Sequence, residues 1–265
     1  MKNHGLENEL EIVEVLNGKT IKELPDFWKR KMKQLCRVLE DDEKIECYKC
    51  YHDQKADISI RVGKRKWSIS IKSGNFVSVH TERISSFTGF LRSLGVNEYL
   101  IETLKLYHYG DDTLDGTGEN RKTLPVIKEE LKERIIEFNE FVNQKDILRP
   151  IVLRFLCCGT PYQRSYVTHI YHGTTEYGIM IDAKTIVDYI CDGFICETEA
   201  IHFGPFIYMP MYRGLKDFDS SNVRRYYISV KWPYIVRDIK DAKEWFFTKE
   251  NRNELYSYDE AQDNN

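Results

Sequence analysis

The chain has 265 residues, a net charge of −3, and 42% hydrophobic against 31% charged residues, a composition typical of a globular protein with a sizeable core. This charge argues against a protein that coats nucleic acid nonspecifically, because such binding depends on neutralising phosphates. No apolar run approaches the roughly 20 residues that span a bilayer, and no signal-peptide core precedes the first elements. With seven cysteines in no disulfide pattern, a cytoplasmic location is expected.

Apolar residues at helical spacing predict a helix over residues 6–17 and a second helix over residues 26–39. Within the first helix Glu9 falls on the apolar stripe, whereas the other acidic residues lie on different faces. A carboxylate on a buried face requires a partner, although the edge of an exposed acidic helix would give the same pattern. Strands are then predicted near residues 45–51, 56–62 and 66–72.

Residues 55–72 alternate between apolar and polar side chains on both sides of a Gly-Lys turn, which predicts a β-hairpin. A two-residue loop at this turn pairs Val62 with Arg65 and sets Asp57 opposite Ser70. Because side chains alternate with period two, the two faces of the hairpin differ completely. One face carries only apolar side chains, namely Ile58, Ile60, Val62, Trp67, Ile69 and Ile71.

The polar face of the hairpin carries both Asp57 and Lys72, which opposed or diagonal positions bring within reach of each other. A carboxylate beside an ammonium group suits metal-dependent cleavage of a phosphodiester. Mg²⁺ takes oxygen ligands, keeps several waters and can hold a phosphate oxygen. We expect Asp57 to bind the metal and Lys72 to orient or deprotonate the attacking water and offset charge on the phosphate. Ser70 is a weak metal ligand.

Two short motifs, Ala56-Asp57 and Ser70-Ile71-Lys72, resemble the two halves of the PD-(D/E)xK motif of the restriction-endonuclease-like nuclease superfamily. Two positions depart from it, since Ala56 replaces the proline and Ser70 replaces the second acid. The resemblance implies an α+β fold with a central mixed sheet flanked by helices. It also implies an endonuclease that cleaves double-stranded DNA with Mg²⁺, for which Mn²⁺ can substitute, as in type II restriction enzymes and related bacterial defence nucleases.

The acid missing at Ser70 has two replacements under this resemblance. Some restriction-enzyme families with Ser-x-Lys take the carboxylate from the following helix, which points to Glu82, expected in the first turn of a helix whose apolar stripe starts at Ile84. A glutamate that only complements the helix dipole would look the same. The superfamily also often places a glutamate of its first helix at the metal, and here that position is Glu9. The implied metal ligands are therefore Asp57, Glu82 and Glu9.

The rest of the chain is predicted to form further helices and a β-rich half. Residues 110–121 form a polar, glycine-rich loop that either closes over DNA or is simply solvated. The apolar run Pro150–Cys158 predicts a central strand. Around it we expect a helix over 126–143, a hairpin across Gly173, a helix over 183–191, and strands near 200–211 and 224–232. The division expected is a nuclease core over 1–160, a β-rich elaboration over 161–258 that completes the sheet or contacts DNA, and a disordered tail over 259–265.

Basic residues supply candidate contacts to DNA phosphates. The hairpin tip is favoured among them because it extends from the expected site, while Arg164, Arg213 and Lys231 lie among strand-borne aromatics that more often serve packing. The candidate DNA-binding residues are Lys64, Arg65, Lys66, Arg121, Arg224 and Arg225. By analogy with restriction enzymes, the expected partners are double-stranded DNA, a second copy in a two-fold dimer and a cognate methyltransferase, with no membrane partner.

Other functions fit the same residues. One is a DNA-binding module on this fold that has lost catalysis because Ser70 replaces an acid. Another is a nuclease for RNA or for structured DNA, since no feature of the sequence separates these substrates. A third is an amphipathic hairpin in a protein-interaction domain, in which Asp57 and Lys72 have no chemical role.

Overall fold

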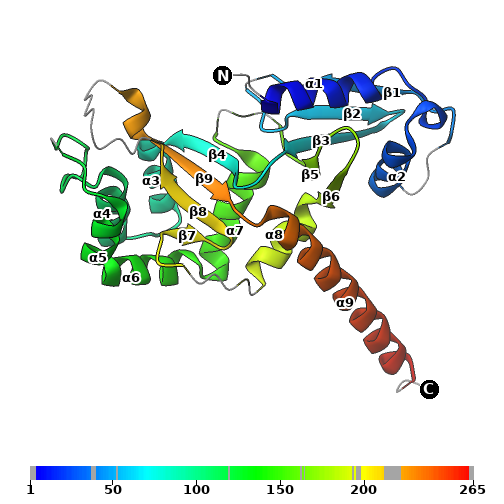
Figure 1. The fold of residues 1–265 in the computed structure, drawn as a ribbon. Coiled ribbons are helices and arrows are strands. Elements are labelled where there is room, and N and C mark those ends of the chain that lie inside the picture. The colour runs from blue at the N-terminus through cyan, green and yellow to red at the C-terminus, as the bar shows by residue number, and fades with distance from the viewer. Residues whose placement is uncertain are drawn as a thin grey trace. The chain divides into compact units, whose positions relative to one another are not determined.

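The computed structural model describes residues 4–36, 40–51, 53–118, 120–161, 163, 165–192, 194, 198–211 and 222–262. The chain forms two compact units, and each is assembled from separate segments (Figure 1). The segments of the first unit fall within 1–75, 157–190 and 234–265, and those of the second within 76–156 and 191–233. The division expected at residue 160 follows chain order, whereas these units interleave along the chain.

The first unit contains a five-stranded mixed sheet in the order β1-β2-β3-β5-β6. All neighbouring strands are antiparallel except β3 and β5, which are parallel. The mixed sheet of the expected α+β fold is thus confirmed, and the hairpin predicted across Gly173 completes it. The strands are β1 (Ile45–Lys49), β2 (Ile58–Val62), β3 (Arg65–Lys72), β5 (His169–Gly173) and β6 (Gly178–Asp182).

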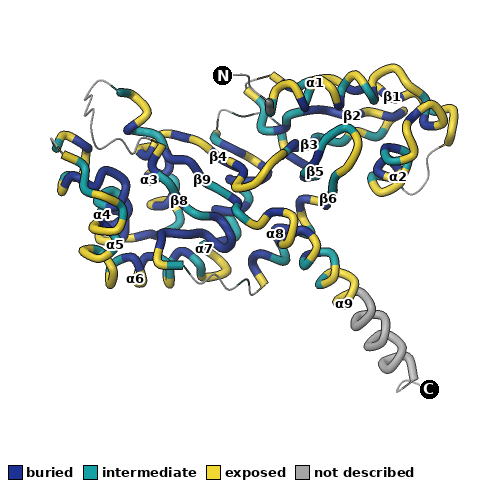
Figure 2. The backbone as a smooth tube through the Cα atoms, in the orientation of Figure 1, coloured by how far each residue is buried: buried dark blue, intermediate teal, exposed yellow. Residues whose placement is uncertain are grey.

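The apolar face of this sheet is covered by the amino-terminal helices (Figure 2). Ile12 and Leu16 from α1, with Trp28 and Met32 from α2, belong to one buried cluster with the apolar residues of β2 and β3. The Trp28 ring also packs 5.3 Å from that of Tyr171 on β5. The helical elements of the unit are α1 (His4–Leu16), η1 (Ile21–Glu23), α2 (Asp26–Leu35), α8 (Ala183–Cys191) and α9 (Ile235–Gln262).

The second unit contains a four-stranded antiparallel sheet in the order β4-β9-β8-β7. Its core is rich in aromatic rings, and Phe155 contacts Phe87, Phe203 and Phe206 edge-on or tilted at centroid distances of 5.5 to 6.0 Å. Such geometries favour the ring quadrupoles. The strands are β4 (Val77–Arg83), β7 (His202–Phe203), β8 (Phe206–Pro210) and β9 (Tyr227–Trp232). The helical elements are α3 (Ile84–Ser93), α4 (Glu98–Tyr109), α5 (Leu124–Glu130), α6 (Lys132–Val142), α7 (Lys145–Leu153), η2 (Arg154–Cys158) and η3 (Val223–Tyr226).

The strand predicted over Pro150–Cys158 is wrong. These residues form the end of α7 and the π-helical turn η2, with Pro150 inside the helix. A fully buried helix and a fully buried strand both show an unbroken apolar run, so periodicity does not distinguish them. Ile151, Val152 and Phe155 are completely buried.

Glu82 also lies in a different element from the one expected. It is the penultimate residue of β4, and α3 begins only at Ile84. Residues 77–80 alternate between apolar and polar side chains, and this alternation is itself a strand signal. The strand predicted near residues 224–232 begins at Tyr227, three residues after its predicted start, because η3 precedes it.

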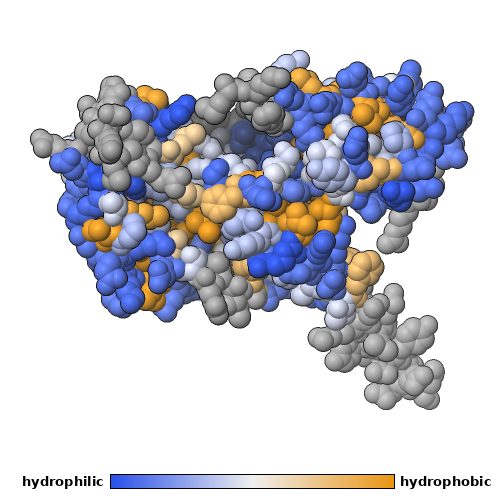
Figure 3. Space-filling model, in the orientation of Figure 1, coloured by the Kyte–Doolittle hydropathy of each residue, from blue (hydrophilic) through white to orange (hydrophobic). Residues whose placement is uncertain are grey.

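At the carboxy terminus, α9 continues to Gln262, and residues 263–265 of the predicted tail lie outside the described residues. Within the described part of the chain, no helix has the length and apolar character required to cross a membrane. In the view of Figure 3 most surface residues are hydrophilic, and apolar side chains form small scattered patches.

Candidate active site

The hairpin that carries Asp57 and Lys72 has the predicted register. Val62 pairs with Arg65, and Ile58 with Ile69. Gly63 takes a positive φ of 58° at the first loop position, where a type II′ hairpin turn places glycine. The Asp57 amide donates to the Ile69 carbonyl at 2.9 Å, which is one residue out of the register of the ladder, so the regular pairing ends at Ile58 and Ile69.

The Asp57 carboxylate is fixed by β3 through one of its oxygens. Oδ2 accepts hydrogen bonds from Ser70 Oγ at 3.0 Å, from the Ile71 amide at 2.6 Å and from Lys72 Nζ at 3.2 Å. Lys72 Nζ also donates to the Ile71 carbonyl at 2.9 Å. The structure therefore brings Asp57, Ser70 and Lys72 together, as their shared polar face of the hairpin predicts. Ser70 orients the aspartate, because its hydroxyl is a donor to Oδ2.

The second oxygen of Asp57 is open. Among the described residues no hydrogen-bond donor contacts Oδ1, and 25% of the Asp57 side chain is exposed. One carboxylate oxygen, several waters and a substrate phosphate form a coordination sphere typical of Mg²⁺. No group of three or more His, Cys, Asp or Glu side chains in the described residues is arranged to hold a metal. Asp57 thus fits a hydrated Mg²⁺ with a single protein ligand.

Cys50 is the neighbour of Asp57 on the β1 side, where its amide donates to the Asp57 carbonyl at 2.9 Å. Burial, with a contribution from the Asp57 charge, raises the pKa of the Cys50 thiol to about 11. The thiol is therefore protonated at neutral pH and is not an active nucleophile, since nucleophilic attack requires the thiolate.

His172 is the strand partner of Lys72 and is not among the site residues predicted from the sequence. It is paired with Lys72 in the parallel β3–β5 register, so both side chains project from the same face of the sheet. His172 Nε2 lies 2.8 Å from the Gly74 carbonyl oxygen. Because a carbonyl only accepts, Nε2 carries the hydrogen and Nδ1 of the neutral ring keeps its lone pair. No local pattern marks His172, because the contact depends on pairing between strands far apart in the chain.

Glu82 belongs to the second unit, where it is buried in a network of donors. Arg154 donates to both carboxylate oxygens, at 2.8 and 2.6 Å, His80 Nε2 lies 2.7 Å from Oε1, and Ser86 Oγ donates to Oε2 at 2.7 Å. Burial acts to raise the pKa of Glu82, but these hydrogen bonds outweigh it and lower the pKa to about 2. The metal-ligand role stays a prediction, and it would require Glu82 to release donors that now hold it.

Glu9 forms an ion pair with Lys49 at the end of β1. Lys49 is paired with Ile58, so it lies on the apolar face of the sheet, opposite to the face that carries Asp57. Glu9, on the apolar stripe of α1, thus has in Lys49 the charged partner that a buried carboxylate requires. The metal-ligand role of Glu9 also stays a prediction.

The hairpin tip offers the exposed cations expected there. Lys64 and Lys66 are exposed, and Arg65 is partly exposed with Nη1 3.6 Å from Glu43 Oε2. Arg224 is exposed on η3. Each of these side chains is accessible to a phosphate. The arginines at 164 and 213 lie outside the described residues.

Two of the predicted DNA contacts have structural partners instead. Arg121 donates from Nε to the Tyr109 carbonyl at 3.0 Å and from Nη2 to the His108 carbonyl at 3.1 Å, at the carboxy-terminal end of α4. Arg225 is buried, with Nη2 3.4 Å from Asp111 Oδ2. These bonds hold the loop that follows α4, so Arg121 and Arg225 are the least available of the six candidates.

The same loop region contains a buried histidine with a fixed tautomer. His108 Nε2 lies 2.7 Å from the Arg225 carbonyl oxygen, and Nδ1 lies 2.7 Å from the Tyr208 hydroxyl. The carbonyl requires a hydrogen on Nε2, so Nδ1 accepts from Tyr208. Burial lowers the pKa of His108 to about 4. The ring is therefore neutral at physiological pH.

A stability prediction follows from His108. Because its folded pKa lies below the ordinary 6.5, its contribution is complete above pH 6.5 and is lost as pH falls toward 4, where the unfolded chain binds the extra proton. We expect His108→Phe to destabilise the protein by about 1–3 kcal/mol at neutral pH, since it leaves two buried polar groups unpaired. Urea unfolding at several pH values would also show a shallower loss of stability with acid in the variant. Equal slopes for both proteins would contradict this prediction.

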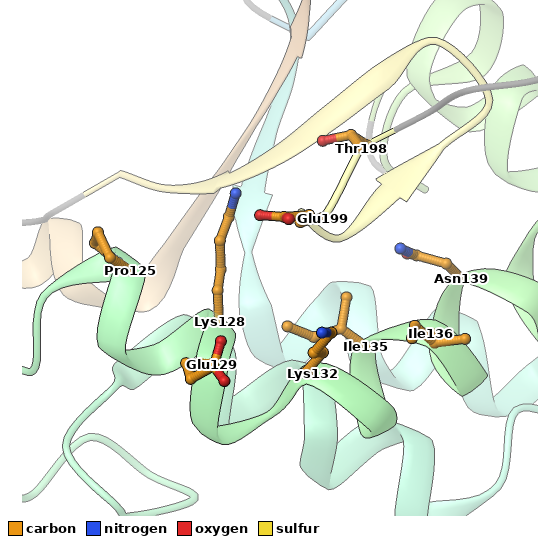
Figure 4. A pocket seen from close by; sticks show the side chains of 9 residues that line it. All are labelled: Pro125, Lys128, Glu129, Lys132, Ile135, Ile136, Asn139, Thr198 and Glu199. Atoms are coloured by element: carbon orange, nitrogen blue, oxygen red, sulfur yellow. The ribbon is translucent and has the colours of Figure 1, made fainter.

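A pocket of about 460 Å³ lies in the second unit between α5, α6 and the segment that carries Glu199 (Figure 4). Lys128 extends toward Glu199 across its opening, and Lys132 and Glu129 flank it. The lining thus contains two acids and two lysines, so its charges balance. None of the candidate site residues lines this pocket.

A restriction endonuclease is among the solved structures that resemble this chain. No family model matches the chain, and no curated protein matches it. Among solved structures, the restriction endonuclease MspI in complex with its cognate DNA is similar at 15% sequence identity, with 87% of this chain and 93% of that chain covered and a TM-score of 0.46.

Proposed function

We propose that this protein is a Mg²⁺-dependent endonuclease that hydrolyses double-stranded DNA, in the manner of a type II restriction enzyme or a related defence nuclease. One observation carries the proposal. Asp57 and Lys72 are in contact at 3.2 Å on a hairpin of a mixed sheet, and the aspartate keeps one open oxygen. A two-fold dimer on a palindromic site and a cognate methyltransferase belong to the same proposal.

The chain's own residues have distinct tasks in this proposal. Asp57 Oδ1 would hold Mg²⁺ or Mn²⁺, which supplies Lewis-acid activation of the phosphate and of a water. Ser70 and the Ile71 amide keep the aspartate in one orientation. Lys72 donates a hydrogen bond to Asp57 Oδ2. Its positive charge would stabilise the negative charge that develops on the phosphate. The exposed cations of the hairpin tip would contact the DNA backbone.

His172 is proposed as the proton acceptor beside Lys72. The ammonium group of Lys72 already donates two hydrogen bonds, whereas Nδ1 of His172 has a lone pair on the same face of the sheet. Acceptance of a proton from the attacking water by a positioned histidine is general base catalysis.

Replacement of His172 tests this role. We expect His172→Gln to lower the single-turnover cleavage rate by about 10²–10⁴-fold, while the amide still donates to the Gly74 carbonyl and preserves the fold. The pH–rate profile should also lose one ionisation. An unchanged profile would restrict His172 to a structural role.

A second function is favoured by a different observation. Since the described residues contain no cluster of acids for a metal, the protein can instead be a module that binds DNA without cleaving it. Such a module would bind duplex DNA equally well with Mg²⁺ and with a chelator, and it would release no products.

The proposed function is tested by incubating the purified protein with phage DNA, single-stranded DNA and RNA, in Mg²⁺, in Mn²⁺ and in a chelator. The proposal predicts discrete fragments of duplex DNA that require the metal. Binding without cleavage would support the binding module, and cleavage of RNA alone would overturn the DNA assignment.

A further inference from the structure

A cavity of about 350 Å³ in the first unit is not used by the proposed function. It lies among α2, β6, α8 and α9, and its volume falls within the range of small-molecule sites. Its polar lining includes Gln34, His169, Asp182 and Lys243. Two phenylalanines of α9, at 246 and 247, form an exposed aromatic wall.

Two lysines near this cavity have no acidic partner among the residues that the structure describes. Lys243 lines the cavity, and no described carboxylate forms an ion pair with it. Lys31 is buried, with Nζ 5.2 Å from the centre of the Phe27 ring. Burial lowers the pKa of both, and for Lys31 repulsion from Lys243 and Arg30 adds to the effect. Partly buried ammonium groups without a counter-charge are stabilised by an anion.

The acid in the cavity lining is already engaged. Asp182 Oδ1 accepts from the Thr185 amide at 3.0 Å at the start of α8, and Oδ2 lies 4.0 Å from His169 Nε2. Burial lowers the pKa of His169 more than Asp182 raises it, so the ring is neutral and offers hydrogen bonding without charge. Lys243 and Asp182 balance within the lining, and the nearby Lys31, which repels Lys243, adds a second positive charge. The pocket of Figure 4 differs, because its lining holds two acids and two lysines.

The aromatic wall indicates which class of anion the cavity binds. Phe246 and Phe247 are 37% and 64% exposed and follow Lys243 within one turn of α9. Planar bases stack on aromatic side chains, and this contact tolerates any base because every base has a π-face. A phosphate alone would leave most of the volume and both rings unused.

We propose that this cavity binds a nucleotide, with its phosphate at Lys243 and Lys31 and its base against Phe246 and Phe247. Gln34 and His169 provide neutral polar groups for the sugar or the base edges. The nucleotide comes either free from solution or from the end of a DNA strand. The nucleotide proposal does not depend on the proposed nuclease site, so the failure of one proposal leaves the other unaffected.

Calorimetric titration of the full chain with AMP, dAMP, adenosine, inorganic phosphate and a 5′-phosphorylated oligonucleotide tests the proposal. We expect saturable binding of AMP or dAMP that is about tenfold or more tighter than that of adenosine or phosphate alone. Tighter binding of the oligonucleotide would identify a DNA strand end as the source.

Two variants and a control complete the experiment. Lys243→Met should weaken mononucleotide binding about tenfold or more, and Phe247→Ala should remove the advantage of the nucleotide over inorganic phosphate. Lys240→Met, at an exposed position of the same helix, should bind as the parent chain does. Absence of saturable binding, binding of phosphate without a base preference, or equal affinities in the parent and Lys243→Met proteins would each overturn the proposal.

Discussion

Replacing Lys72 with methionine is expected to lower the rate of DNA cleavage by about 10²–10³-fold, the usual cost of removing one fixed donor from a developing charge. The chain should still fold, because Ser70 and the Ile71 amide keep Asp57 in place. The ion pair is partly exposed, with 16% and 25% of its two side chains accessible, so the free energy of unfolding should change by less than about 1 kcal/mol.

Single-turnover cleavage and urea unfolding together measure this effect. Lys22→Met provides the control, because Lys22 is exposed on η1 of the same unit and lies outside the site. Full activity in Lys72→Met would contradict the role given to this lysine. Loss of activity together with a collapse of the fold would leave that role unsupported, and Lys72→Arg would then show whether a charge at this position restores cleavage.

The largest effect on stability is expected at Glu82. Glu82→Gln leaves the buried Arg154 guanidinium without its counter-charge, and breaking a buried pair by removing one partner costs about 3–5 kcal/mol. The stabilisation from the carboxylate is present above pH 4.5 and is lost as pH falls toward the folded pKa of about 2. Urea unfolding of both proteins at neutral pH measures this difference.

The exposed pair Arg92–Glu98 supplies a matched comparison. Glu98 accepts from two nitrogens of Arg92, as Glu82 does from Arg154, but its side chain is 64% exposed. Glu98→Gln should therefore cost less than about 1 kcal/mol. If Glu82 instead binds the metal, Glu82→Gln would retain stability and raise the Mg²⁺ concentration needed for cleavage, which would overturn the structural role.

The sequence was sufficient to predict the hairpin and its site geometry. Alternation fixes which residues share a face, and the Gly-Lys turn fixes the register, so the contact between Asp57 and Lys72 follows from local rules. The helix over Ala183–Cys191 and the hairpin across Gly173 have equally local signals and were also predicted correctly.

Other features depended on contacts that no local pattern contains. The apolar run that ends at Cys158 is helical, although an unbroken apolar run is equally typical of a buried strand. His172 reaches the site only through the parallel pairing of β3 and β5. Arg121 resembles a surface cation in sequence, yet it binds carbonyls at the end of α4. Such long-range partners decide which charged side chains remain available for function.

The central claim is that Asp57 recruits the metal for DNA cleavage. The most direct test is a Mg²⁺ titration of single-turnover cleavage for the parent chain and Asp57→Asn, which keeps the side-chain size and the contacts to Oδ2 nearly unchanged. The account predicts cleavage that rises with Mg²⁺ in the parent chain and is abolished at every Mg²⁺ concentration in the variant. Equal cleavage by the two proteins, or cleavage by the parent chain in a chelator, would contradict it.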